Sequence, residues 1–205
     1  MPGRLFLTAS PAEVAAATGH DLPGKFVLPP RLNIAPGQEL LTLSPEGIGM
    51  MRWGLIPVGR VNARGRPVME TLINARGETV FDKTAYAGTG RAVVPVSGWY
   101  EWTGEARRKT AWRIRPKGGG LLLFAAITDT WTGPGGLRVP QIAMVTCAPN
   151  ADVAAVHHRM AVILAPEDAG DWLIGPEAAA RELIRPWPAG RLTVEKANDM
   201  DWDAT

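Results

Sequence analysis

The second residue of the chain is the first candidate for chemistry. The sequence begins Met1-Pro2-Gly3-Arg4. A small second residue usually permits removal of the initiator methionine, and proline would then carry the amino-terminal secondary amine. An α-amino group has an unperturbed pKa of about 7.7–8.0, so part of it is unprotonated near neutral pH and can attack an aldehyde to form an iminium ion. Pro2 is therefore a candidate nucleophile, and the alternative is an ordinary frayed chain start.

A second candidate is the segment 72–79, where an apolar run ends in polar residues. Side chains two residues apart on a strand point the same way, so Asn74 and Arg76 are expected to share one face. An asparagine there could orient a sugar or aldehyde oxygen, and an arginine could bind a phosphate. The alternative is a hydrogen-bond network at the end of a strand.

A third candidate is Glu101, which lies among the aromatic residues Trp99, Tyr100 and Trp102. A carboxyl group that loses contact with water has a raised pKa and suits general acid or base catalysis. Trp99 and Trp102 could also offer faces on which bases stack. The alternative is a salt-bridged glutamate on a strand with aromatic core residues.

The fourth candidate is the run His157-His158-Arg159-Met160. Histidine is the side chain whose charge changes near neutral pH, and Arg159 could bind a phosphate beside it. Paired histidines also suggest a metal ligand set, but no carboxylate or cysteine lies at a ligand spacing. We therefore expect neither a metal nor another cofactor.

Composition favours one folded domain over residues 1–205. Of the 205 residues, 46% are hydrophobic and 20% charged, which excludes bulk disorder, and the net charge of +2 is only mildly basic. Cys147 is the single cysteine, so no internal disulfide can form, and its apolar neighbours predict a buried, unreactive thiol. Since no apolar run approaches 18 residues, we expect no membrane segment and a cytoplasmic location.

The elements that must position these residues are mostly short strands. Apolar or alternating runs, separated by Gly and Pro, predict strands at 40–43, 48–53, 92–96, 111–115, 121–127, 141–147 and 191–194. Helices are expected from a capping box at Ser10 to Gly19, and over 150–156, 166–174 and 176–184. Residues 58–67, with three arginines, are expected to form an exposed basic loop. The predicted fold class is α+β: a single compact β-rich domain of curled, barrel-like antiparallel sheets with a few peripheral helices.

Six segments together resemble the SOS-response-associated peptidase (SRAP) family. They are Gly3-Arg4, Asn33-Ile34-Ala35-Pro36-Gly37, Arg52-Trp53-Gly54-Leu55-Ile56-Pro57, Ile73-Asn74-Ala75-Arg76, Gly98-Trp99-Tyr100-Glu101-Trp102 and His157-His158-Arg159-Met160. The resemblance extends from residue 1 to about 199 and leaves 200–205 as a tail. It implies a β-rich α+β fold with a positively charged DNA channel. It also implies that the protein recognises abasic sites in single-stranded DNA and links to them covalently.

The resemblance also implies roles for individual residues. Asn74 would hold the opened sugar, Glu101 would be the active-site glutamate, and His157 the acid/base histidine. Three arginines would contact DNA phosphates: Arg4, Arg76 and Arg159. Three further positions would line the DNA: Thr146, Trp102 and Pro36.

Position 2 departs from the family pattern, in which it is a cysteine. The cysteine thiol closes a thiazolidine ring on the Schiff base, which makes the link durable. Pro2 keeps an amine but has no thiol, so we expect a transient adduct at most. A secondary amine gives a cationic iminium that acidifies the neighbouring carbon, and His157 or Glu101 could remove that proton and expel the 3′ phosphate. The family tryptophan after the Trp-Gly-Leu-Ile-Pro segment is Val58 here, and the proline after the His-x-Arg-Met segment is Ala161.

Three functions remain open from the sequence. The first is an abasic-site sensing and processing enzyme of the SOS DNA damage response, with Pro2 as nucleophile. The second is a single-stranded DNA-binding module without catalysis. The third is a peptidase limited to its own amino terminus, because no Ser/His/Asp set is recognisable. The expected partner is single-stranded DNA that contains abasic sites, and we expect a monomer, nucleoid-associated if the source is bacterial.

Overall fold

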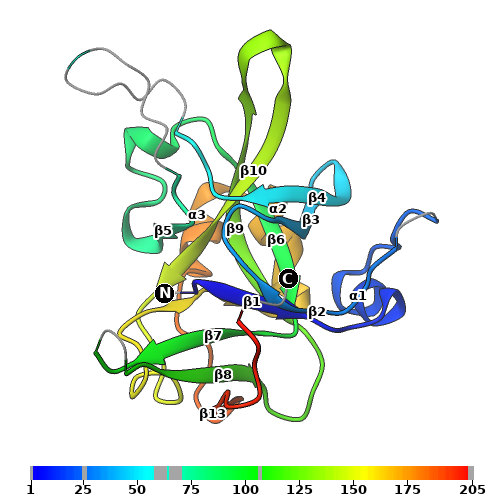
Figure 1. The fold of residues 1–205 in the computed structure, drawn as a ribbon. Helices are drawn as coiled ribbons and strands as arrows, with labels where there is room; N and C mark the ends of the chain where they lie inside the picture. The colour runs from blue at the N-terminus through cyan, green and yellow to red at the C-terminus, as the bar shows by residue number, and fades with distance from the viewer. Residues whose placement is uncertain (1, 25–26, 58–63, 65–70, 106–107, 203–205) are drawn as a thin grey trace.

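A computed structural model describes residues 2–24, 27–57, 64, 71–105 and 108–202, and its strands form two sheets (Figure 1). The smaller sheet is antiparallel and has the strand order β13-β8-β7-β1-β2. Its strands are β1 (Arg4–Leu7), β2 (Arg31–Ile34), β7 (Gly98–Thr103), β8 (Thr110–Pro116) and β13 (Leu192–Lys196). The alternating pattern predicted β8 and β13 as strands, but it set no bounds for β1, β2 and β7.

The larger sheet curls until it closes on itself. Its eight strands are β3 (Glu39–Ser44), β4 (Gly47–Trp53), β5 (Asn74–Arg76), β6 (Gly90–Val96), β9 (Leu122–Thr132), β10 (Arg138–Cys147), β11 (Met160–Ala161) and β12 (Ile163–Leu164). The path β10-β4-β3-β6-β9 returns to β10, which gives a closed ring of five strands. The predicted barrel-like, β-rich α+β class is therefore confirmed. Two pairings differ from the antiparallel prediction, because β10 runs parallel to both β4 and β5.

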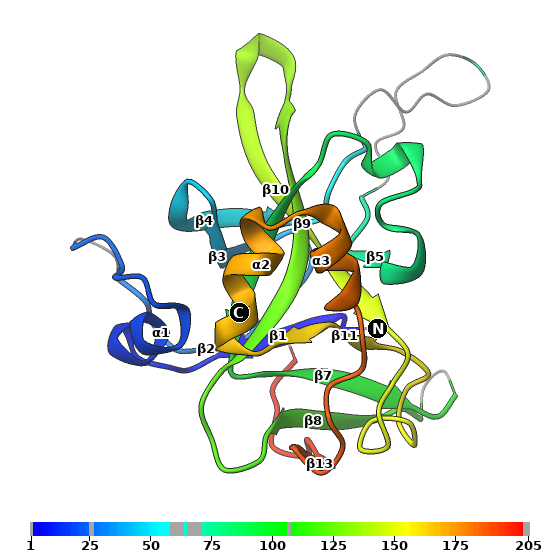
Figure 2. The same cartoon turned by 180° about the vertical axis from the view of Figure 1, so that it is seen from behind.

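In the part of the chain that the structure describes, three short α-helices lie outside the sheets (Figure 2). Helix α1 (Pro11–Thr18) has the expected capping box at Ser10 and ends at Gly19, whose φ of 69° suits glycine. Helices α2 (Ala169–Ile174) and α3 (Glu177–Glu182) follow the 3-10 turn η4 (Pro166–Asp168). The other 3-10 turns are η1 (Gly77–Thr79), η2 (Thr84–Tyr86) and η3 (Pro134–Gly136).

The helix expected over residues 150–156 is a series of turns, so that prediction was wrong. Asn150 Oδ1 accepts a hydrogen bond from the backbone N–H of Val153, and the carboxylate of Asp152 accepts hydrogen bonds from the backbone of Gly190 and Leu192. Short polar side chains that bond nearby backbone compete with helix formation. The turns deliver the chain to His157.

Alternation along β7 divides its side chains between two faces of the smaller sheet. Trp99 is fully buried and packs edge-on against Phe124 of β9, with ring centroids 5.5 Å apart, so this face looks into the main core. Tyr100 packs on the other face against Phe6. By alternation, Glu101 shares the inner face with Trp99, and Trp102 shares the outer face with Tyr100.

Two predictions from the sequence concern other parts of the chain. Most of the basic loop expected at 58–67 lies outside the described residues; Arg64, which is described, is exposed. Within the described ranges, no helix is long and apolar enough to span a membrane.

Candidate functional site

Residue 2 lies at the site expected from the sequence. Pro2 is buried just before β1, and its carbonyl accepts a hydrogen bond of 3.0 Å from Asn74 Nδ2 at the start of β5. The other amide atom, Asn74 Oδ1, is shielded from solvent, and none of the described residues donates a hydrogen bond to it. An asparagine oxygen can accept two hydrogen bonds, so this atom can receive a donor from a ligand.

Strand pairing brings the chain start towards Glu101. In the antiparallel register of β1 and β7, Arg4 lies opposite Tyr100, so the residues before Arg4 continue towards Glu101. The Glu101 residue is 3% exposed. Its burial raises the pKa of the carboxyl group, and this outweighs smaller opposing contributions from the chain's amino-terminal charge and from the indole of Trp99. A carboxylate in this setting is a stronger base than one in water.

His157 faces the same carboxylate. Its Nε2 lies 4.0 Å from Glu101 Oε2, and its ring stacks on that of His158 with centroids 4.4 Å apart. Burial lowers the pKa of His157 to about 4, with further lowering by positive charge nearby, including that of Arg159. The imidazole is therefore neutral near pH 7.

The proton of the neutral imidazole can be placed from its hydrogen bonds. The backbone N–H of Arg159 lies 2.9 Å from His157 Nδ1, and a backbone N–H can only donate. The carbonyl of Arg159 lies 3.0 Å from the same nitrogen, but a proton on Nδ1 would leave that N–H without its acceptor. Buried N–H groups without partners are rarer in proteins than carbonyls without partners. We therefore assign the proton to Nε2, the nitrogen that faces Glu101 across 4.0 Å, which is beyond direct hydrogen-bond distance.

Arg159 is held in place within the protein. Its guanidinium forms an ion pair with Glu78, at 2.8 Å to Oε2, and donates to the carbonyl of Thr146 at 2.6 Å and to its hydroxyl at 3.1 Å. The side chain of Arg159 is 12% exposed, and Thr146 is fully buried. Thr146 thus accepts a hydrogen bond from Arg159 and donates one from its hydroxyl to the carbonyl of Ala75.

The other residues predicted for the site are placed around it. Arg76 is exposed on β5, two residues after Asn74, with buried Ala75 between them, as the expected alternation requires. Arg4 is half-buried and donates from Nε to Asn33 Oδ1 at 3.0 Å. Pro36 lies in the turn between β2 and β3.

The two tryptophans beside Glu101 differ from expectation. Trp99 is fully buried in the main core and offers no stacking face, so the alternative of an aromatic core residue describes it. Trp102 lies on the sheet face opposite Glu101, where it packs against Trp202 with ring centroids 5.2 Å apart. Strand alternation explains both positions, because Trp99 points inward with Glu101 and Trp102 points outward.

Three neighbours of the site were not predicted from the sequence: Glu78, Asn33 and Trp202. Glu78 follows Arg76 by two residues, so its place near the site could have been predicted from the sequence. Asn33 and Trp202 are far apart in the sequence and meet only in the tertiary fold. The predicted burial of Cys147 is confirmed, and this burial raises the pKa of its thiol to about 11. No group of three or more metal-ligating side chains occurs in the ranges that the structure describes.

Comparisons with known proteins agree on the family. A family model described as SOS response associated peptidase (SRAP) matches residues 1–200. The abasic site processing protein YoqW of Bacillus subtilis is 33% identical over 152 residues, which cover 70% of this chain and 66% of that protein. YedK of Escherichia coli, which bears the same description, is 30% identical over 150 residues, 70% of this chain and 64% of its own.

A solved structure shares the fold of this chain. A crystal structure of a Bacteroides thetaiotaomicron protein superposes with a TM-score of 0.82 at 21% identity, covering 96% of this chain and 92% of that one. At this identity the likeness establishes the fold alone. Alignment to the family model over nearly the whole length, together with the relatives above, shows that the chain belongs to the SOS response associated peptidase (SRAP) family.

Proposed function

We propose that this protein processes abasic sites in single-stranded DNA through an amine at residue 2, as part of the DNA damage response. The observation that carries the proposal is the hydrogen bond between Asn74 and the carbonyl of Pro2, because it fixes the chain start beside Glu101 and His157. Relatives with the description "abasic site processing protein" support the substrate. The aligned region spans slightly less than two thirds of those relatives, so their activity is carried over here as a proposal.

The chemistry begins once Met1 has been removed. The proline nitrogen adds to the aldehyde carbon of the ring-opened sugar, and a proton moves from nitrogen to oxygen. The resulting hydroxyl takes up one further proton from solvent and leaves as water, which gives the iminium cation. Asn74 Oδ1, which has no donor among the described residues, is placed to accept a hydrogen bond from a sugar hydroxyl. His157 Nε2–H is placed to donate to the departing oxygen.

Glu101 is then the base of the second step. Its buried carboxylate removes a proton from the carbon next to the iminium, and the electron pair expels the 3′ phosphate by β-elimination. Water hydrolyses the remaining iminium and restores the amine. The tautomer inferred for His157 supports Glu101 as the base, where the sequence left both residues open. Without a thiol at residue 2, no thiazolidine ring forms, so the adduct is transient.

Borohydride trapping tests the proposal. The protein is incubated with a single-stranded oligonucleotide that contains one abasic site, with and without reductant, and any adduct is mapped by peptide mass spectrometry. We expect a reduced adduct on the amino-terminal proline and none without reductant. An adduct on a lysine, or no adduct in protein whose intact mass shows that Met1 has been removed, would overturn the nucleophile. Binding without any trapped product would support the non-catalytic DNA-binding alternative.

A Pro2→Cys variant provides the matched control. It restores the thiol and leaves the other described site residues in place. If the pocket is as proposed, this variant forms a crosslink that survives denaturing electrophoresis without reductant. A Pro2→Cys, Asn74→Ala double variant should lose that crosslink, which ties the result to the described site.

A further inference from the structure

The C-terminal residues 197–202 cross the outer face of the smaller sheet (Figure 1). We call them the strap. The backbone N–H of Ala197 donates to Ala111 of β8. The strap then reaches β7, where the hydroxyl of Tyr100 lies 3.2 Å from Met200 Sδ. Its end is held at β2, because Asn33 Nδ2 donates to the carbonyl of Trp202 at 2.8 Å.

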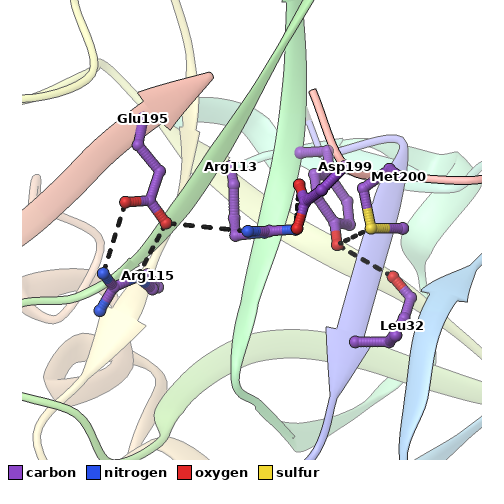
Figure 3. Close-up of polar contacts among 7 residues, drawn as sticks. Leu32, Arg113, Arg115, Glu195, Asp199 and Met200 are labelled. Atoms are coloured by element: carbon purple, nitrogen blue, oxygen red, sulfur yellow. Dashed lines mark hydrogen bonds and ion pairs between the residues drawn. The ribbon is translucent and has the colours of Figure 1, made fainter. Parts of the chain in front are cut away.

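The strap places anionic and aromatic groups on cationic and aromatic partners. One terminal nitrogen of Arg113 lies 2.9 and 3.0 Å from the two carboxylate oxygens of Asp199 (Figure 3). The Trp202 ring meets Tyr100 edge-on, with centroids 5.0 Å apart, and Trp102 at 5.2 Å. Arginines bind phosphates as they bind carboxylates, and nucleic acid bases stack on aromatic rings as indoles do.

The strap is held by surface contacts that another ligand can replace. The Asp199 side chain is 68% exposed, and ion pairs at such exposure contribute little to stability. A cavity of about 570 Å³ lies between the strap and residues 29–33, so the two surfaces are not tightly packed there. The strap sequence is also acidic, with Asp199 and Asp201, and the chain continues with Asp203.

The surface beneath the strap adjoins the site of residue 2. Asn33 bonds both the strap, through Trp202, and Arg4 of β1, two residues after Pro2. Arg113 lies over the Tyr100 ring, 5.9 Å from its centroid. Arginines interleaved with aromatic rings are the usual lining of single-strand binding surfaces.

We propose that the outer face formed by Tyr100, Trp102 and Arg113 is a second contact surface for a single DNA strand, and that the strap occupies it until DNA displaces it. The proposal rests on the proposed function, since it extends the path of the same DNA strand. In it, the Asp199 carboxylate takes the place of a phosphate and the Trp202 indole the place of a base. The strap then lowers affinity for DNA that lacks an abasic site.

Two changes of the strap and one control test this proposal. The first is the double variant Asp199→Asn, Asp201→Asn, and the second is a chain that ends after Asn198. The control is Glu167→Gln, Glu182→Gln, which alters the net charge by the same amount at exposed acids near α2 and α3. Binding of a fluorescent single-stranded oligonucleotide without an abasic site is measured by anisotropy at several salt concentrations.

We expect both strap variants to bind about three- to tenfold more tightly than the unmodified protein, and the control to change by less than about twofold. Adding Arg113→Gln to the aspartate variant should remove the gain. Strap variants that bind no more tightly than the control would overturn the strap proposal while leaving the proposed function intact. If neither the unmodified protein nor any variant binds or is trapped on abasic DNA, both proposals fail. The aspartate variant keeps the aromatic packing, so the test does not depend on the shortened chain folding.

Discussion

Two carboxylates on opposite faces of the smaller sheet differ in their electrostatic setting. Glu101 on the inner side has a side chain 4% exposed, and burial raises its pKa. Asp199 on the outer side is 68% exposed, and hydrogen bonds from Arg113 lower its pKa. The inner setting thus makes Glu101 a stronger base. The outer setting leaves Asp199 a surface anion bound to Arg113, which can also bind other anions.

The β-strand β7 contributes side chains to both faces of the smaller sheet. Along β7, Trp99 and Glu101 point inward, and Tyr100 and Trp102 point outward. On the inner side, none of the described residues donates to the acceptor Asn74 Oδ1, whereas on the outer side the polar groups of the strap are paired over a second aromatic cluster. Chemistry is expected where buried polar groups are held incompletely satisfied, and support or regulation is expected where they are satisfied.

The largest effect is expected from Glu101→Gln. This change removes the base but keeps the shape, so the rate of β-elimination of abasic DNA should fall about 100-fold or more. The free energy of unfolding should stay the same or rise, because a buried ionisable group becomes neutral. Product formation on gels and urea denaturation measure the two quantities. Glu182→Gln, at an exposed acid of α3, is the control, and an elimination rate within about threefold of the unmodified protein would remove Glu101 from the mechanism.

The second effect concerns the pH dependence of stability through His157. Its pKa is about 4 in the folded protein, against an ordinary value of 6.5, so its stabilising contribution is complete above about pH 6.5 and is lost as the pH falls towards 4. Between pH 6.5 and 4.5 the unmodified protein should therefore lose about 1–2 kcal/mol more unfolding free energy than His157→Gln. Denaturant titrations at both pH values measure this difference. Parallel losses in the two proteins would contradict a neutral, buried imidazole.

The sequence motifs named residues that the fold brings near residue 2, but they carried little information on the surroundings of those residues. Asn74, Glu101 and His157 lie together because the motif segments are short and each belongs to one element. Thr146 and Trp102 could not be placed in the same way, since their orientation depends on strand register. A shift of one residue along β7 would exchange its faces.

The fold class was predictable because several elements carry local sequence signals. Alternating strands such as β8 and the capping box of α1 carry local signals. The parallel pairings of β10 and the crossing of the strap depend on contacts between residues far apart in the chain, for which one sequence gives no local signal. The turns at 150–156 were mistaken for a helix because the pattern did not show that Asn150 and Asp152 bond distant backbone.

The third prediction tests whether the outer face contributes to the stability of the protein and not to catalysis. Burial raises the pKa of Tyr100, so its hydroxyl stays protonated and donates to the carbonyl of Leu32 at 3.0 Å (Figure 3). Tyr100→Phe removes that hydrogen bond and should lower the unfolding free energy by about 1 kcal/mol. The rate of β-elimination of abasic DNA by Tyr100→Phe should match that of the unmodified protein, the reverse of what we expect for Glu101→Gln. An elimination rate that falls together with stability would mean that the two faces are not independent.

The smallest effect is expected from Asp199→Asn alone. The carboxylate is largely in water, so the hydrogen bonds with Arg113 replace hydration of comparable strength, and salt screens the remaining attraction. The denaturation midpoint should therefore be unchanged at moderate salt. If Asp199→Asn lowered the midpoint as much as Tyr100→Phe, the strap would be a structural brace, and its displacement by DNA would be too costly for the outer face to bind a strand. An unchanged midpoint together with DNA binding tighter than that of the charge-matched variant Glu182→Gln would assign Asp199 to competition with DNA, because the two variants carry the same net charge and differ in the occupancy of Arg113.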